Sequence, residues 1–184
     1  MKLWKGLLPK AAIEMRIIGL DPGLWNTGWG IIDVQSNQLK YVADGTVRPC
    51  PKQSLGQRLS GLYSGLTDAI IDFEPIEAAV EETFLHKNPK STLKLGEARG
   101  VVILAPALAG LSVAEYSANQ IKKSVVGAGH AGKGQVQMMV KRILPGCQFS
   151  SADAADALAA AICHANSRET ERRWVDNKVF REVF

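Results

Sequence analysis

Cysteine is scarce in this 184-residue chain, which has three cysteines, Cys50, Cys147 and Cys163, all far apart. An odd number of isolated cysteines offers neither a disulfide framework nor a CxxC metal pair, so we expect a protein of the reducing cytoplasm. Long hydrophobic runs are also missing, because the longest, residues 101–111, is broken by Pro106 and is too short to cross a bilayer. These absences exclude a secreted miniprotein and a membrane protein, and the length fits a single domain.

Acidic residues are rare in one long stretch of the chain. Residues 83–142 hold nine basic and two acidic side chains, although the whole chain balances Lys+Arg 22 against Asp+Glu 18. The nine basic residues are Lys87, Lys90, Lys94, Arg99, Lys122, Lys123, Lys133, Lys141 and Arg142. Such an imbalance indicates a polyanionic partner, most commonly nucleic acid, although a solvated basic face explains it equally well.

The order of apolar patterns predicts a mixed α/β protein. Strands are expected at 16–20, 27–34, 39–47, 76–81 and 111–116, and helices at 54–73, 91–108, 117–126, 135–144 and 152–165. This order favours a five-stranded mixed sheet flanked by helices. We expect residues 1–14 to be an N-terminal extension, disordered or upstream of the true start, 15–167 to be the folded domain, and 168–184 to be a charged tail. Residues 127–134 are expected to be a mobile, glycine-rich loop.

Two acidic residues follow predicted strands directly. Asp21 ends the apolar segment before Pro22 and Gly23, and Glu81 ends the fourth strand. The carboxyl ends of strands are where α/β sheets build their sites. Each residue also has an ordinary explanation, because Asp-Pro-Gly is a common turn and strand-end acids are often exposed. Trp25, close to Asp21 in sequence, is expected to be an aromatic at the rim of this region.

Two more acids, Asp153 and Asp156, are spaced i, i+3 in an alanine-rich helix. This spacing places both carboxylates on one helical face. An acid in the first turn of a helix is stabilised by the positive end of the helix dipole, and this alone could explain one of the two acids. Two neighbouring like charges repel each other, however, and no lysine or arginine lies within ten residues of Asp156 in sequence. We therefore expect a metal ion to neutralise them.

An all-oxygen ligand set without a histidine or cysteine cluster suits Mg²⁺ or Mn²⁺ better than zinc. Two such ions, held by Asp21, Glu81, Asp153 and Asp156, are the arrangement that phosphodiester hydrolysis uses. A basic protein with an acidic, metal-binding cluster is therefore a candidate nuclease.

The motifs around these acids resemble the RuvC family of Holliday-junction resolvases. The similarity covers residues 15 to about 165 and depends on four segments in the family's order: IIGLDPGLWNTGWGIID, AAVEETFLHKN with the following LKLGEARG, SANQIKKSVVG with GKGQVQ, and DAADALAAAICHA. The resemblance implies a ribonuclease H-like fold that brings the four carboxylates together. It also implies a homodimer that makes paired, symmetric nicks in four-way junction DNA and works beside the RuvA and RuvB branch-migration proteins.

The resemblance also implies roles within the basic stretch. Lys122 and Lys133 match lysines that contact the DNA backbone or the active site, and Phe84 matches an aromatic that stacks on junction bases. A core position remains an alternative for Phe84. Three further lysines are either phosphate contacts or a solvated face: Lys87, Lys90 and Lys94. The helix at 91–108 is a plausible dimer face.

Other functions fit parts of the pattern. A sugar kinase or actin-like ATPase begins with a similar strand, Asp-x-Gly turn and hairpin, but needs a second such domain for which this chain has no room. Another ribonuclease H-like polynucleotide nuclease and a non-catalytic junction-binding module are the remaining alternatives. Four intact acids argue against the binding module, because an acidic cluster facing phosphates would only weaken its binding.

Overall fold

The computed structural model describes residues 15–36, 38–83 and 88–182, with side chains up to residue 170. The strands are β1 (Met15–Asp21), β2 (Thr27–Gln35), β3 (Gln38–Val47), β4 (Glu77–Glu81) and β5 (Ser112–Tyr116). The helices are α1 (Leu55–Phe73), α2 (Pro89–Leu108), α3 (Ala118–Val126), α4 (Lys133–Ile143) and α5 (Ala152–Glu182). The strands form one sheet in the order β3-β2-β1-β4-β5. Because β1 is antiparallel to β2 and parallel to β4, the expected five-stranded mixed sheet is confirmed.

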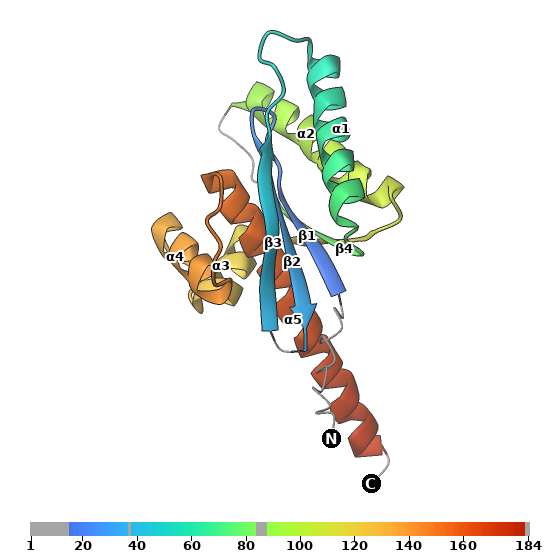
Figure 1. Cartoon of the computed structure of the whole chain (residues 1–184), viewed down its shortest axis with the longest axis vertical. Coiled ribbons are helices and arrows are strands. Elements are labelled where there is room, and N and C mark those ends of the chain that lie inside the picture. Colours follow the sequence, from blue (N-terminus) through green and yellow to red (C-terminus); the bar gives the residue numbers. More distant parts are fainter. Residues whose placement is uncertain (1–14, 37, 84–87, 183–184) are drawn as a thin grey trace, which may run out of the picture.

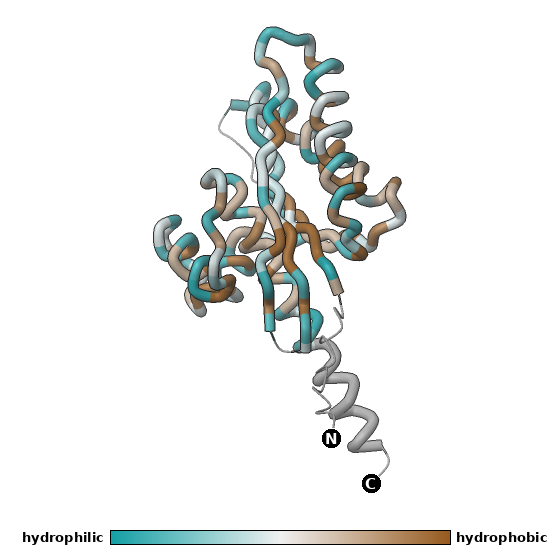
Figure 2. Tube along the Cα trace, in the orientation of Figure 1, coloured by the Kyte–Doolittle hydropathy of each residue, from teal (hydrophilic) through white to brown (hydrophobic). Residues whose placement is uncertain are grey.

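Helices cover both faces of the sheet (Figure 1). Alternation along β1 sends Ile17 and Ile18 to opposite faces, and both side chains are fully buried. Ile17 packs in a cluster with residues of α3, α4 and α5, whereas Ile18 packs with residues of α1 and α2. Figure 2 shows the hydrophobic colouring concentrated in the central strands, between these two layers. The strand pattern therefore gives the molecule two cores, one on each side of the sheet.

Glycines in β1 and β2 let α5 lie directly on the sheet. A Cβ atom at Gly28 would stand 2.0 Å from the carbonyl oxygen of Asp153, and one at Gly19 would stand 1.9 Å from that of Ala157. No side chain fits into such a contact, so glycine is required at both positions. The facing side of α5 is rich in buried alanines, which keeps the helix equally close along its length. This close packing fixes where the first turn of α5 sits.

Several helix ends differ from the sequence expectation, among them the start of α2, which lies at Pro89 instead of residue 91. The last helix continues to Glu182 instead of ending at residue 165, since no glycine or proline interrupts residues 152–182. The fourth helix begins at Lys133, inside the segment expected to be a loop, with Gln135 accepting a hydrogen bond from the Gly132 amide at 2.8 Å. Lys133 is therefore held on a helix. None of the helices in the described part of the chain combines the length and hydropathy that crossing a membrane requires.

Candidate functional site

The sheet brings Asp21 and Glu81 to the same edge. In the parallel pair β1 and β4, Leu20 is the register partner of Val80, so the next residue of each strand is one of the two acids. Both side chains are partly buried. The first and fourth strands therefore lie side by side, which agrees with the ribonuclease H-like fold that the resemblance implies.

The first turns of α5 bring the other two carboxylates to this edge. The backbone of Asp153 packs against Gly28, and Asp153 lines the same groove as Asp21. Asp156, one turn further on, lines a cavity of about 220 Å³ together with Glu81. Asp21 therefore has electrostatic neighbours on β4 and on α5, and the structure brings all four predicted acids into one region.

Crowding of these acids perturbs their protonation. Burial, followed by the charges of Glu81, Asp156 and Asp153, raises the pKa of Asp21 to about 8. Burial and the charge of Asp156 raise the pKa of Glu81 to about 7, although Lys122 and Lys133 act in the opposite direction. Near neutral pH both groups therefore hold a proton for part of the time. Carboxylates in this state gain from a cation that replaces the proton.

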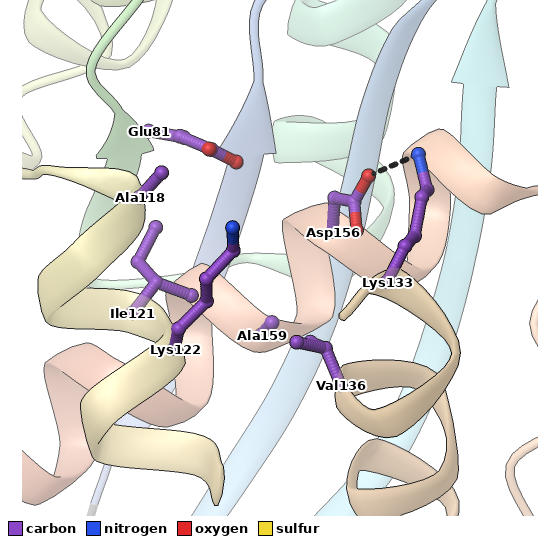
Figure 3. Close-up of a pocket in the computed structure, with 8 residues that line it drawn as sticks. All are labelled: Glu81, Ala118, Ile121, Lys122, Lys133, Val136, Asp156 and Ala159. Atoms are coloured by element: carbon purple, nitrogen blue, oxygen red, sulfur yellow. Dashed lines mark ion pairs between the residues drawn. The ribbon is translucent and has the colours of Figure 1, made fainter. Parts of the chain in front are cut away.

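Two lysines face the carboxylates across the cavity (Figure 3). Lys122 extends from α3, and its ammonium group points toward Glu81. Lys133 extends from α4, and its Nζ lies 2.8 Å from Oδ2 of Asp156. This ion pair raises the pKa of Lys133, mainly through its hydrogen bond to Asp156. The expectation that a metal neutralises Asp156 did not take account of Lys133, which lies 23 positions earlier in the sequence and already faces this carboxylate.

A hydrogen-bonded clamp holds the segment before α5. Asp44 on β3 accepts hydrogen bonds from the backbone amide of Ser150 at 2.7 Å and from its hydroxyl at 2.6 Å. The hydroxyls of Thr46 and Ser151 are 2.6 Å apart, and Ser151 Oγ also accepts a hydrogen bond from the amide of Ala154. The clamp ties the start of the helix that carries Asp153 to the sheet. Sequence reasoning missed this clamp, because its partners lie about a hundred residues apart.

The loop after Asp21 is closed by a buried threonine. The hydroxyl of Thr27 donates a hydrogen bond to the carbonyl oxygen of Gly23 at 2.6 Å and accepts one from the Gly23 amide at 3.3 Å. Because Thr27 is fully buried, this pair of contacts fixes the path of residues 23–27. Trp25, on this loop, is exposed as the rim aromatic that the sequence predicts.

The remaining predicted DNA contacts are only partly visible. Phe84 and Lys87 lie outside the described residues. Lys90 is exposed in the first turn of α2, and its backbone amide donates a hydrogen bond to the capping side chain of Asn88 at 3.0 Å. Lys94, one turn later, is also exposed and lines the groove that contains Asp21. Both lysines therefore face solvent, and Lys94 does so on the side of the carboxylates.

The chemistry of the donor set fits a hard divalent cation. All four acids offer oxygen ligands, which Mg²⁺ and Mn²⁺ prefer. Their mutual repulsion, evident in the raised pKa values of Asp21 and Glu81, is what a cation would relieve. Among the described residues, no three histidine, cysteine, aspartate or glutamate side chains already lie close enough together to hold an ion. An ion held here by one or two of the carboxylates would be completed by water or phosphate oxygens.

Comparisons with known proteins agree on one family. The family model of crossover junction endodeoxyribonuclease RuvC matches residues 17–164. The chain is 61% identical over 159 residues to the crossover junction endodeoxyribonuclease RuvC of Paramagnetospirillum magneticum, which spans 86% of this chain and 96% of that protein. A second relative, from Rhodospirillum rubrum, is 58% identical over 154 residues, or 84% of this chain and 91% of that protein.

Solved structures give the same result. The structure of Thermus thermophilus RuvC in complex with a Holliday junction substrate superposes with a TM-score of 0.80 at 30% identity, covering 86% of this chain and 97% of that one. The yeast mitochondrial Holliday junction resolvase Ydc2 superposes with a TM-score of 0.64 at 13% identity, over 94% of this chain and 89% of that one, which speaks for the fold alone. The expected ribonuclease H-like fold is thereby confirmed.

Proposed function

The chain belongs to the RuvC family of crossover junction endodeoxyribonucleases, and from this premise we propose how its own residues cut a four-way DNA junction. The protein is a Holliday-junction resolvase, a nuclease that hydrolyses phosphodiester bonds. We assign catalysis to Asp21, Glu81, Asp153 and Asp156. The observation that carries this assignment is that carboxylates from β1, β4 and α5 meet beside two lysines at one edge of the sheet.

Mg²⁺ is the cofactor we propose for this site, with two ions and with Mn²⁺ as a substitute. The four carboxylates would hold the ions. Their mutual repulsion supports this role, because it contributes to the raised pKa values of Asp21 and Glu81 in the metal-free protein. When bound, the ions supply charge stabilisation for an attacking water and for the leaving oxygen.

The lysines have a separate task in this mechanism. A phosphodiester must approach a site that four acids make negative, and Lys122 and Lys133 offset that repulsion at the cavity. Lys133 is paired with Asp156 and more than half exposed, so it can also reach a phosphate oxygen that arrives there. We propose that Phe84, Lys87 and Lys90 add junction contacts, as the family resemblance implies.

A homodimer is the assembly we propose, with α2 as its interface. An exposed stripe runs along this helix at spacings of three and four residues: Leu93, Gly96, Gly100, Leu104 and Leu108. Leu93 and Leu108 are each about two-thirds exposed. A Cβ atom at Gly96 or Gly100 would meet nothing within 4 Å in this protomer, so a second helix can approach closely there. Two copies would place two sites on two strands of one junction.

Family membership also suggests the surroundings of the reaction. We propose that RuvA and RuvB, which move the branch point, work beside this protein, and that it acts in the cytoplasm. The cysteines agree with a reducing compartment, because Cys50, Cys147 and Cys163 are all free. Coupled reactions test the partnership: adding RuvA and RuvB to a junction should change the rate or position of cutting.

The experiment that tests the function uses a labelled mobile four-way junction and the matching linear duplex, each with Mg²⁺ or with EDTA. Paired, symmetric nicks in the junction alone, and only with metal, are expected. Equal cutting of both substrates would instead indicate a general ribonuclease H-like nuclease. Binding without cutting in both Mg²⁺ and Mn²⁺ would indicate a junction-binding module and would overturn the catalytic assignment.

A further inference from the structure

An exposed tryptophan stands beside the carboxylates without a role in the mechanism above. Trp25 lies on the loop between β1 and β2, four residues after Asp21, and its side chain is 60% exposed. Its exposed indole offers a large, flat apolar surface with a polar N–H to a ligand that reaches the neighbouring carboxylates. The closed path of residues 23–27, fixed by Thr27, keeps this ring in place.

A buried arginine supports the ring from below. The guanidinium carbon of Arg58 on α1 lies 4.1 Å from the centre of the Trp25 ring. Arg58 is only 7% exposed, and its Nη2 donates a hydrogen bond to the carbonyl oxygen of Leu24 at 2.7 Å. Its buried Nε lacks a hydrogen-bond partner among the residues the structure describes. Arg58 thus fixes the loop and the ring together, and it leaves positive charge in the wall behind them.

Trp25 and Arg58 form one side of a groove of about 480 Å³. Asp21 and Asp153 lie in the same groove, and its other side comes from the first turns of α2, including Ser91 and Lys94. The volume is in the range of about 300–1000 Å³ that small-molecule sites occupy. The first turn of α2 contains no acid, so the positive end of the helix dipole and Lys94 make that side favourable to an anion.

We propose that this groove is a nucleotide-binding subsite next to the scissile phosphate, in which Trp25 stacks on an unpaired base and Lys94 contacts the phosphate backbone. An aromatic ring stacks on any base whose face is free, and bases at the crossover of a four-way junction are the ones that can leave their stack. A continuous duplex offers no such base. Trp25 would therefore favour junctions over duplexes. This inference depends on the proposed function, because it places the reacting phosphate at Asp21 and Asp153.

The test measures junction binding and cleavage by Trp25→Ala and Trp25→Phe in full-length protein. The matched control is Tyr63→Ala, which removes another exposed aromatic, on α1, that does not line the groove. Loss of one base–aromatic stack is expected to weaken junction binding roughly 5- to 150-fold in Trp25→Ala. Trp25→Phe should keep most of the affinity, and binding to linear duplex should change little in either variant.

A spectroscopic readout reports the stack directly. Junctions that carry 2-aminopurine at successive positions beside the cleavage site should show one position whose fluorescence is quenched further by wild-type protein and by Trp25→Phe, but not by Trp25→Ala. In parallel, Lys94→Gln should lower junction affinity. The slope of log affinity against log salt concentration should fall by about one. The melting temperature of each variant is also measured, so that a loss of binding can be told apart from a loss of folding.

Three results would overturn the subsite. Wild-type affinity and quenching in Trp25→Ala would show that the ring touches no base. An equal loss on junction and duplex would show a general effect. Loss of self-association with unchanged junction binding would make Trp25 a contact between copies of the chain. If the wild-type protein failed to cut junctions at all, the proposed function would fail whatever the Trp25 variants showed in binding.

Discussion

The ammonium nitrogen of Lys133 lies 2.8 Å from a carboxylate oxygen of Asp156, across the gap between α4 and α5. The pair closes one side of the cavity that also contains Glu81. Lys133 lowers the pKa values of both Asp21 and Glu81, which shows that its charge acts on the whole cluster. One lysine therefore sets both how strongly the acids attract a cation and how strongly they repel a phosphate.

Replacement of Lys133 by glutamine should separate these two effects. Without the ammonium group the cluster is more negative, so Mg²⁺ should bind the DNA-free variant more tightly than the wild type. Junction cleavage should fall by about 10- to 100-fold, the value of one charge-assisted contact. Calorimetric titration of Mg²⁺ and single-turnover cleavage check the two outcomes. Weaker Mg²⁺ binding together with unchanged cleavage would contradict the account.

Asp21 should destabilise the metal-free protein as the pH rises. Its pKa is about 8 in the folded protein, well above the unfolded value of about 3.9. The folded state therefore holds the proton more tightly, and the stability that Asp21 contributes is full below pH 4 and lost as the pH rises through about 8. At pH 8 in EDTA, Asp21→Asn should melt at least about 2–4 °C above the wild type, the shift that 1 kcal/mol produces at this size.

The same melting curves contain their own controls. At pH 5 the difference between Asp21→Asn and the wild type should shrink, and Mg²⁺ should stabilise the wild type more than the variant. Asp72→Asn, an exposed acid on α1, should show no such pattern. A variant that is less stable than the wild type at pH 8 would mean that Asp21 is not a strained carboxylate.

Gly28→Ala should displace α5 from the sheet. The added Cβ would stand 2.0 Å from the carbonyl oxygen of Asp153, so the helix start that carries two of the proposed catalytic acids must move. We expect a loss of about 1–3 kcal/mol in the free energy of unfolding, as for other overpacked sites. The cleavage rate should fall by more than the decrease in the folded fraction of the protein accounts for. Gly56→Ala, where a Cβ meets nothing within 4 Å, is the matched control and should be tolerated.

Leu104→Glu should separate the two copies of the proposed dimer. Leu104 is about half exposed in the protomer and lies in the middle of the α2 stripe, so a charge there costs little to the monomer and much to a packed interface. Sedimentation should show the wild type as a dimer and the variant as a monomer. Paired nicking of a junction should be lost with it. A wild type that is monomeric at micromolar concentration would refute the α2 interface.

The sheet and the positions of Asp21 and Glu81 could be predicted because strand patterns are local. Each acid directly follows a run of buried strand residues, whereas the pairing of these two strands, which brings the acids together, was implied only by the family resemblance. The i, i+3 spacing of Asp153 and Asp156 is likewise visible within one helix. What the chain does over short distances was therefore sufficient to find the four acids.

The features that were missed depend on partners far apart in the sequence. Lys133 and Asp156 lie on different helices, so a search along one helix could not pair them. The clamp of Asp44 on Ser150 and the contact of Gly28 with Asp153 span even longer separations. A signal for the last of these was present, because glycines in β1 and β2 together with an alanine-rich helix are typical of a close helix–sheet contact.

The central claim is that four carboxylates form one catalytic site, and amide substitutions test it most directly. Single-turnover cleavage of a labelled junction in Mg²⁺ is measured for Asp21→Asn, Glu81→Gln, Asp153→Asn and Asp156→Asn, beside junction binding in EDTA. Glu82→Gln, the exposed neighbour of Glu81, is the matched control. We predict that each of the four variants loses at least about 100-fold in rate, with junction affinity equal to or tighter than that of the wild type, while Glu82→Gln cuts normally. Cleavage near the wild-type rate by any of the four would contradict the assignment.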